Sequence, residues 1–290
     1  WTAAAQGFQL QNTKATIIKD VRLAWIELAY LLAAKKILLA HEQVLQKLVQ
    51  ATTAKLSSGL GYQHDVYRSQ MLLSEVAQLI LQNQVATEQT RAQLSRWLGP
   101  AMAARCHPDG FPVWPKPMDQ QSLLHVLKQH PMLQDKQSQI KSAEAKVNQC
   151  KEGVRPARSA GIYYAFRQGK DSMNDQSRSD FIGLQFSTEL PFFTVNRQQR
   201  QISASIKQYQ AAEYQYRTDY LDLKKQVDQD YAAYQSLQKQ ISLYQTESMQ
   251  QAKQYAASTK SAYANTQVAF DTVANAYAEM LQTSLQYLFV

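Results

Sequence analysis

Apolar and aromatic side chains recur at a helical spacing along the last third of the chain. From Ile202 to Tyr244 the 42 residues hold twelve intervals of mean length 3.5, with Glu213 as the one polar member of the series. A repeat of 3.5 residues is typical of a coiled coil, in which a narrow seam faces a partner helix. The members between the two ends are Ile206, Tyr209, Tyr216, Tyr220, Leu223, Val227, Tyr231, Tyr234, Leu237 and Ile241.

The length of this pattern limits the possible architectures. A helix from about Asn196 to Tyr263 would be on the order of 100 Å long at 1.5 Å per residue, which no globular core covers. The seam is rich in Tyr, whose ring is apolar and whose tip is polar, while the other faces carry Gln, Ser, Lys and Asp. Such a helix fits a wall between packed helices and water. A soluble coiled coil with an irregular core is the alternative.

Glycine and proline punctuate the chain at few places. Neither occurs between Gly7 and Gly59, between Gly61 and Gly99, or after Pro191. Because each costs about 1 to 3 kcal/mol inside a helix, these stretches predict long helices. All eight prolines lie from Pro100 to Pro191.

Two short segments, 58–66 and 264–272, form an internal repeat with an offset of 206 residues. In each, a residue that tolerates positive φ (Gly59, Asn265) precedes an aspartate by six positions (Asp65, Asp271). An aspartate at a helix start accepts hydrogen bonds from free N–H groups, so both aspartates are candidate N-caps. Both segments are therefore predicted to be tight turns of antiparallel helical hairpins. The counterparts of both chain ends fall outside the sequence, so a longer protomer is expected.

Two short stretches alternate between apolar and polar or small residues, which predicts two strands. Strands of this kind with aromatic residues are typical of transmembrane β-barrels, and a soluble hairpin packed on a helix is the alternative. A strand that continues into a helix of such length favours the barrel. No stretch approaches 18 consecutive apolar residues. The face expected to contact lipid comprises Ile162, Tyr164, Phe166, Ile182, Leu184 and Phe186.

The predicted fold is mainly α with a small β part: long antiparallel coiled-coil helical hairpins plus a β-hairpin that contributes to a transmembrane β-barrel. Helices are also expected from about Gln120 to His130 and from Met132 to Cys150. Four segments follow: a first helical hairpin at 8–98 (tip 58–65), a connector with equatorial helices at 99–156, the β-hairpin at 157–194, and a second helical hairpin at 195–290 (tip 264–271).

Charge and candidate chemistry add little. Lys and Arg outnumber Asp and Glu by 31 to 23, but they stand singly among Gln and Ala, which disfavours a nucleic-acid or membrane-surface binding rod. His107, His125 and His130 match no metal-ligand spacing, so no metal site is predicted. Cys106 and Cys150 could pair in an oxidising periplasm, although two free thiols are favoured. No catalytic or phosphate-binding arrangement is evident, so neither an enzyme nor a cofactor is expected.

Several motifs together resemble the TolC family of outer-membrane factors. They are 21–28 (VRLAWIEL), Ser58-Gly59-Leu60 with Asp65-Val66, 94–99, His130-Pro131, Arg167, and 180–198 with its Leu190-Pro191-Phe192-Phe193. The stretch from Arg167 to Arg197 is most similar to the CzcC- and CusC-like branch, which serves heavy-metal RND exporters.

The resemblance implies a homotrimer whose protomers share one 12-stranded barrel and one periplasmic α-barrel. It places the protein in the outer membrane of a Gram-negative bacterium, as a passive conduit for a substrate delivered by an inner-membrane RND pump through a periplasmic adaptor. The adaptor would contact Ser58, Gly59, Leu60, Ala264 and Asn265. Asp271 matches an acidic residue that narrows the closed entrance, whereas the next acidic position of the family falls at Ala274.

Overall fold

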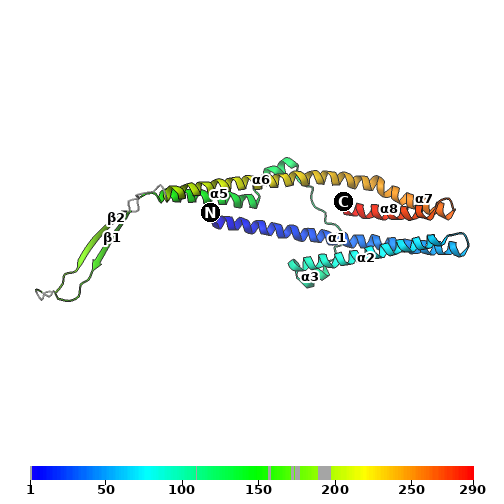
Figure 1. Cartoon of the computed structure of the whole chain (residues 1–290), viewed down its shortest axis with the longest axis horizontal. Helices are drawn as coiled ribbons and strands as arrows, with labels where there is room; N and C mark the ends of the chain where they lie inside the picture. Colours follow the sequence, from blue (N-terminus) through cyan, green and yellow to red (C-terminus); the bar gives the residue numbers. More distant parts are fainter. Residues whose placement is uncertain (1, 109, 156–157, 171–172, 174–176, 189–196) are drawn as a thin grey trace. The chain divides into compact units, whose positions relative to one another are not determined.

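The computed structural model describes residues 2–108, 110–155, 158–170, 173, 177–188 and 197–290. It divides into two compact units, and Figure 1 identifies their helices and strands. One unit comprises Trp1–Asn12 with Leu124–Lys225, and the other comprises Thr13–Leu123 with Gln226–Val290. The expected fold class is confirmed: the described chain is mostly helical and contains one small antiparallel hairpin of strands.

The first helical hairpin consists of α1 (Thr2–Ser57) and α2 (Gln63–Leu98). Gly7 lies inside α1, so the helix continues through this glycine. Asn83 ties the two helices together, because its side-chain amide donates a 3.0 Å hydrogen bond to the carbonyl of Leu31. Thr52 and Ser69 share a buried hydrogen bond of 3.0 Å nearer the tip.

The second helical hairpin consists of α6 (Gln198–Leu243), a π-helical turn at Tyr244–Ser248, α7 (Met249–Ala264) and α8 (Phe270–Phe289). The predicted helix start at Asn196 lies outside the described residues. The predicted seam of α6 is half-buried at every member except Glu213 and Leu237, which are exposed. At the π turn, the side chains of Gln245 and Tyr287 form a 2.9 Å hydrogen bond to α8.

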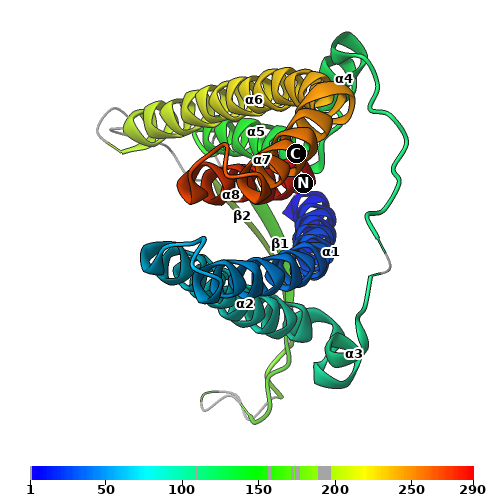
Figure 2. The ribbon, with the colours of Figure 1, turned by 90° about the vertical axis from the view of Figure 1, so that its right-hand side faces the viewer.

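The two helical hairpins pack together near their tips, where α7 and α8 lie beside α1 and α2 (Figure 2). One apolar cluster takes side chains from all four helices: Leu38, Leu45 and Leu48 from α1, Leu72, Val76 and Ile80 from α2, and Ala256, Tyr263, Phe270, Val273, Ala274, Ala276, Tyr277 and Leu281 from α7 and α8. A second cluster joins Leu28, Leu94, Ala103 and Cys106 at the other end of α2. Burial of these faces therefore fixes the tips against each other.

The connector contains one helix more than the sequence pattern predicted. The short α3 (Pro100–Arg105) follows α2 directly, with Pro100 at its first position, where a missing N–H group costs nothing. The two predicted helices are confirmed as α4 (Gln120–Leu127) and α5 (Pro131–Glu152), and the side chain of His130 caps α5 by accepting from the Met132 N–H.

Helices α5 and α6 run antiparallel within the same unit. Lys136 of α5 forms a 3.3 Å ion pair with the largely buried Asp219 of α6, and Gln215 donates a 2.8 Å hydrogen bond to the same carboxylate. Leu133 and Val147 are buried on the packed face of α5. The pairing fixes which residues of the two helices face each other.

The strands β1 (Arg158–Ala165) and β2 (Phe181–Thr188) pair antiparallel, with Ile162 opposite Leu184 and Tyr164 opposite Ile182. On the opposite face the ring of Tyr163 covers Gly183, where an added Cβ would lie only 2.4 Å from the ring. That close approach is possible only because Gly183 has no side chain.

The described part of the chain contains no disulfide, no metal-binding cluster and no helix that could span a membrane. Cys106 and Cys150 are both free thiols. Within the described ranges, no three His, Cys, Asp or Glu side chains form a group that could hold a metal ion. Among the helices that the structure describes, none has a stretch long and apolar enough to cross a lipid bilayer.

Candidate functional site

The first tip is a glycine-dependent helix terminus. Gly59 has a φ of +72°, and two backbone hydrogen bonds close the end of α1: Leu60 N–H to Lys55 O at 2.9 Å and Gly59 N–H to Leu56 O at 3.0 Å. This is the pattern of a Schellman motif, in which a left-handed residue follows the last helical turn. The predicted left-handed turn at Gly59 is therefore confirmed.

The second tip has the same hydrogen bonds but a different left-handed residue. Gln267 N–H bonds to Ala262 O at 2.9 Å, and Thr266 N–H bonds to Tyr263 O at 3.1 Å. The positive φ of +57° belongs to Thr266, whereas Asn265 has a φ of −90°. The prediction of a left-handed Asn265 was wrong. A β-branched residue is strained in the left-handed conformation, whereas asparagine adopts it more readily. The conformational preferences therefore favoured the neighbouring Asn265.

The tips are therefore equivalent at an offset of 207 residues, and not 206. Gly59 corresponds to Thr266, and the helix that follows begins at Gln63 in the first hairpin and at Phe270 in the second. In this alignment Asp65 corresponds to Thr272, while Asp271 corresponds to His64. The two aspartates do not occupy equivalent positions.

Neither aspartate is an N-cap, so the prediction that Asp65 and Asp271 cap their helices was wrong. The N-cap of α2 is Tyr62 and that of α8 is Ala269, and neither makes a side-chain capping bond. Asp65 and Asp271 both lie in the first turn of their helices, where a negative charge still meets the positive end of the helix dipole. Asp65 is the third residue of α2 and Asp271 is the second residue of α8.

Asp65 instead joins the two hairpins. Its carboxylate is buried and accepts a 3.1 Å hydrogen bond from the hydroxyl of Tyr263, the residue three positions before Thr266. Lys55 reaches the same tyrosine from α1: its Nζ donates a 2.6 Å hydrogen bond to the Tyr263 carbonyl and lies 4.0 Å from the centre of the ring. We call Lys55, Asp65 and Tyr263 the tip latch.

The surroundings of the latch keep Tyr263 neutral. Burial, together with the negative charge of Asp65 and the hydrogen bond to it, raises the pKa of Tyr263 to about 12. The ring also packs edge-on against Phe270 with centroids 5.5 Å apart. On the solvent side, His64 approaches Asp65 at 3.1 Å and stacks on Tyr62. The phenol therefore remains a hydrogen-bond donor at physiological pH.

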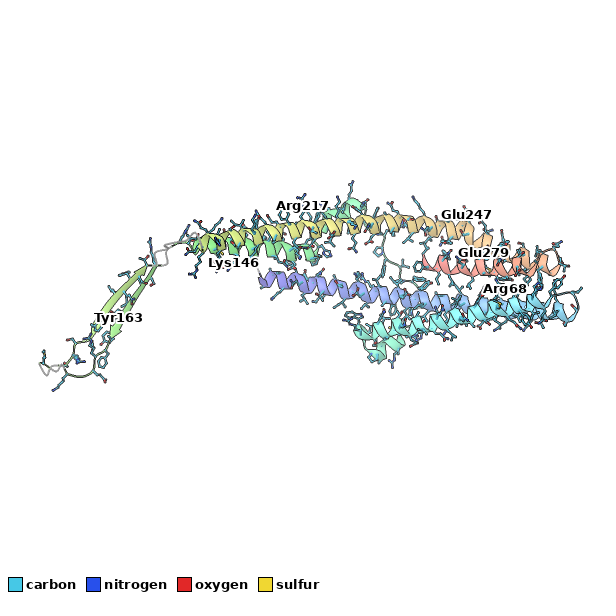
Figure 3. All side chains as sticks on the ribbon, viewed as in Figure 1. Arg68, Lys146, Tyr163, Arg217, Glu247 and Glu279 are labelled. Carbon is cyan, nitrogen blue, oxygen red and sulfur yellow. The ribbon has the colours of Figure 1, made fainter. Side chains whose placement is uncertain are left out.

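Asp271 has a different environment. Its side chain is 77% exposed and forms a 3.9 Å ion pair with Arg68. Arg68 projects from α2, as labelled in Figure 3. Ala274, one turn further along α8, is fully buried in the tip cluster. An acidic side chain at 274 would point into this core, so of positions 271 and 274 only the first presents an exposed carboxylate.

The tips also expose apolar surface. Leu60 and Tyr62 are 71% and 69% exposed, and a groove of about 360 Å³ runs between the two tips. The groove is lined by both turns, including Leu60, Thr266 and Val268. Ser58, Ala264 and Asn265 are exposed at the same end of the hairpins. The five predicted adaptor-contact residues are thus gathered by the fold on one surface.

The β-hairpin presents a second exposed apolar face. Its register puts Ile162, Tyr164, Ile182, Leu184 and Phe186 on one side of the sheet, and these side chains are 61% to 79% exposed. Phe166, the sixth predicted member, directly follows β1 and is 66% exposed. The pairing places the five strand residues on one face, since residues directly opposite each other share a face, and it does not extend to Phe166.

Three residues of the tip region escaped the sequence pattern. Lys55 and Tyr263 are 208 residues apart, so no local motif relates them. His41 is buried between Leu38 and Leu45 on the core face of α1, where burial lowers its pKa to about 4. His41 stands in the sequence among apolar residues at helical spacing, and this pattern could have predicted its burial. Of the three histidines considered earlier, His107 contacts Arg91 at 3.4 Å, His125 is exposed and His130 caps α5.

Comparison with known proteins places these features in a family context. The model of the outer membrane efflux protein family matches residues 123–288, which is more than half of the chain and includes both strands and the second helical hairpin. No curated protein sequence matches the chain.

Solved structures with the same fold cover almost the whole chain. The outer-membrane channel OprN matches 99% of this chain with a TM-score of 0.88 and 18% identity, and VceC from Vibrio cholerae matches 99% with a TM-score of 0.81 and 18% identity. CusC matches 99% with a TM-score of 0.75 and 17% identity. The chain spans 65%, 70% and 70% of the lengths of these three proteins, respectively.

Proposed function

Because the chain belongs to the outer membrane efflux protein family, we propose that it is the conduit-forming part of an outer-membrane channel in a tripartite efflux system. The observation that carries this proposal is the exposed apolar face of the β-hairpin. Five large side chains on one side of two strands stand 61% to 79% exposed, which is the arrangement expected of a barrel wall that faces lipid. A scaffold protein in water would have no use for such a face.

The proposal assigns a role to each segment. Residues 8–98 and 195–290 would form the α-barrel in the periplasm, 157–194 would supply strands to a shared barrel, and 99–156 would form the equatorial connector. The boundaries at 156, 157, 194 and 195 lie outside the described residues. Two strands cannot close a barrel, so a homotrimer in the outer membrane of a Gram-negative bacterium, with more strands from each full-length protomer, completes the pore.

The tips would be both the docking surface and the gate. Ser58, Gly59, Leu60, Ala264 and Asn265 offer exposed turns and small residues to a periplasmic adaptor, which in turn connects to an inner-membrane RND pump. The tip latch holds the second hairpin against the first, so opening requires the Tyr263–Asp65 bond to break. Asp271, exposed beside the second tip, would then line the entrance with negative charge.

We further propose a class of substrate. The similarity of Arg167 to Arg197 to the CzcC- and CusC-like branch favours heavy-metal cations. The residues Leu190-Pro191-Phe192-Phe193, which contribute to that similarity, lie outside the described residues. Transport itself would be passive, with the pump supplying the energy.

The direct test is a conductance measurement on the full-length protein that contains this chain. Reconstituted in a planar lipid bilayer, it should produce discrete ion-conducting steps that need no ATP. Cells that carry Gly59→Pro should lose efflux and adaptor cross-linking, because proline cannot adopt the positive φ of this turn. A protein that remains in the aqueous phase and never conducts would overturn the proposal.

A further inference from the structure

Seven cations lie in two short segments of the chain. Residues 145–158 and 197–212 carry them together with one anion, and Glu144 and Glu213 stand directly outside the two segments, so that 144–158 with 197–213 has a net charge of +4 out of +8 for the whole chain. We call these cations the basic band. They are Lys146, Lys151, Arg155, Arg158, Arg197, Arg200 and Lys207, and the anion is Glu152.

The fold brings the two segments together. Helices α5 and α6 are antiparallel, with Lys136 beside Asp219 at 3.3 Å and with Gln149 and Gln208 lining the same groove. Continuing this pairing to the end of α5 places its last turn, with Lys151, opposite the first turns of α6. Figures 1 and 2 show the two helices side by side. Charges that are dispersed in the sequence are therefore concentrated at one end of this helix pair.

The cations of the basic band are available to a ligand. All seven side chains are exposed. Arg155 pairs with Glu152 at 2.8 Å on the surface, while Lys146 and Lys207 each donate to a glutamine. In the part of the chain that the structure describes, none of the other six cations has a carboxylate at ion-pair distance. Seven exposed cations, of which only Arg155 is ion-paired in the described part of the chain, favour an anionic partner.

The band adjoins the exposed apolar face of the β-hairpin. Arg158 opens β1 on the same side of the sheet as Ile162 and Tyr164, because alternate residues of a strand share a face. At about 3.3 Å per residue, Arg158 lies roughly 13 Å from Ile162 along the strand. A lipid-facing surface that ends in a cluster of arginines matches a bilayer in which hydrocarbon gives way to phosphate.

We propose that the basic band binds the phosphate groups of anionic phospholipids in the membrane leaflet on the side of the helices. This inference rests on the proposed function, since it requires the β-hairpin to be in a membrane. The band would fix the depth of the β-hairpin in the bilayer and enrich anionic lipid around the protein.

The test compares lipid selectivity in charge variants of the full-length protein. The band variant combines Lys151→Gln, Arg155→Gln, Arg200→Gln and Lys207→Gln. The matched control combines Lys224→Gln, Lys225→Gln, Lys239→Gln and Lys253→Gln, which remove the same charge from exposed positions further along the second hairpin. Each protein is reconstituted in nanodiscs of phosphatidylethanolamine with phosphatidylglycerol, extracted in mild detergent, and analysed for retained lipid by native mass spectrometry.

The wild type and the control should retain phosphatidylglycerol with about tenfold preference, and the band variant should lose this preference. Equal preference in all three proteins overturns the inference. Arg155→Gln and Arg200→Gln as single substitutions, each expected to weaken the preference, replace the band variant if it does not insert.

A second measurement separates this inference from the proposed function. Channel conductance of the wild type is recorded in bilayers of phosphatidylethanolamine alone. Conductance without any preference for phosphatidylglycerol refutes lipid binding by the band and leaves the conduit intact. A wild type that neither inserts nor conducts refutes both.

Discussion

The hydroxyl of Tyr263 on α7 donates a 3.1 Å hydrogen bond to the buried carboxylate of Asp65 on α2. Lys55 of α1 holds the backbone of the same tyrosine, so three helices meet at one side chain. Because a buried charge is costly without its donor, separation of the two hairpins is opposed at this point.

Removing the phenol should open the channel. Tyr263→Phe keeps the ring against Phe270 but deletes the donor to Asp65, at a cost of about 1.5 to 3 kcal/mol for a hydrogen bond to a charged group. That cost should shift the equilibrium between closed and open forms by roughly 10- to 150-fold, measured as open probability in planar bilayers. Tyr255→Phe, at an exposed position on the same helix, is the control and should not change gating. Equal open probability in both variants would refute the latch.

The left-handed conformation of Thr266 predicts an unusual gain in stability. Thr266→Gly should stabilise the second tip by about 1 kcal/mol, because glycine adopts positive φ without the strain of a β-branched side chain. Asn265→Gly, one position earlier, should cost up to about 1 kcal/mol because Asn265 has an ordinary negative φ. Thermal denaturation followed by circular dichroism measures both. If Asn265→Gly is the stabilising variant, the offset of 207 is wrong.

The two faces of β2 should respond differently to charge. Leu184→Lys places a cation on the apolar face, and in a bilayer this should cost about 2 to 4 kcal/mol and reduce the amount of assembled protein in the outer membrane. Gln185→Lys adds the same cation to the opposite face, across from Gly161, and should be tolerated. Equal assembly of the two variants would show that the apolar face does not contact lipid.

Asp271 is predicted to line the entrance of the conduit. Asp271→Ala should weaken block by divalent cations and change single-channel conductance, because the substitution removes an exposed negative charge near the second tip. The recordings compare the wild type and the variant with and without added divalent cation. Unchanged conductance and unchanged block would limit Asp271 to a local role in the first turn of α8.

His41 makes stability depend on pH. Burial lowers its pKa to about 4 in the folded chain, against about 6.5 when unfolded, so the unfolded chain takes up the proton first as the pH falls. Stability should therefore be full above pH 6.5 and should decline between pH 6.5 and 4. His41→Gln should remove the decline in stability that comes from this histidine. Tyr277 and Glu75, which line a cavity together with His41, are unchanged in this variant. His125→Gln removes an exposed histidine and serves as the control for urea unfolding across this range.

Much of the fold was accessible from the sequence because helix breakers and periodicity act locally. The stretches without Gly and Pro became α1, α2 and the α6–α7 helix, and the alternating residues became β1 and β2. The helix α3 was missed because Pro100 looks like a breaker, although it is tolerated at the first helical position. The left-handed residue of the second tip was misplaced because tertiary packing at Tyr263 outweighs the preference of Asn265.

The candidate site was less accessible, since its contacts join distant parts of the chain. Asp65 was singled out as a cap, but its partner lies 198 residues away and belongs to no local motif. The grouping of charge is equally hard to predict from the sequence. Cations that stand singly in the sequence predict no patch, whereas the antiparallel pairing of α5 with α6 brings seven of them toward one end of the helix pair. Which residues become neighbours is decided by packing, and spacing alone does not reveal it.

The π-helical turn at Tyr244–Ser248 explains how two offsets coexist in one repeat. Before the turn, the partly buried Val227, Tyr231 and Tyr234 match Val21, Trp25 and Leu28 of α1 at an offset of 206, whereas after it the buried Thr259 matches the buried Thr52 at 207. A π turn holds one residue more than an α-helical turn of the same rise. The second hairpin thus carries a one-residue insertion, absorbed within a single turn, and α1 has none at the corresponding place. If the two hairpins descend from one duplicated ancestor, this turn is the record of where their lengths diverged while their buried faces stayed in phase.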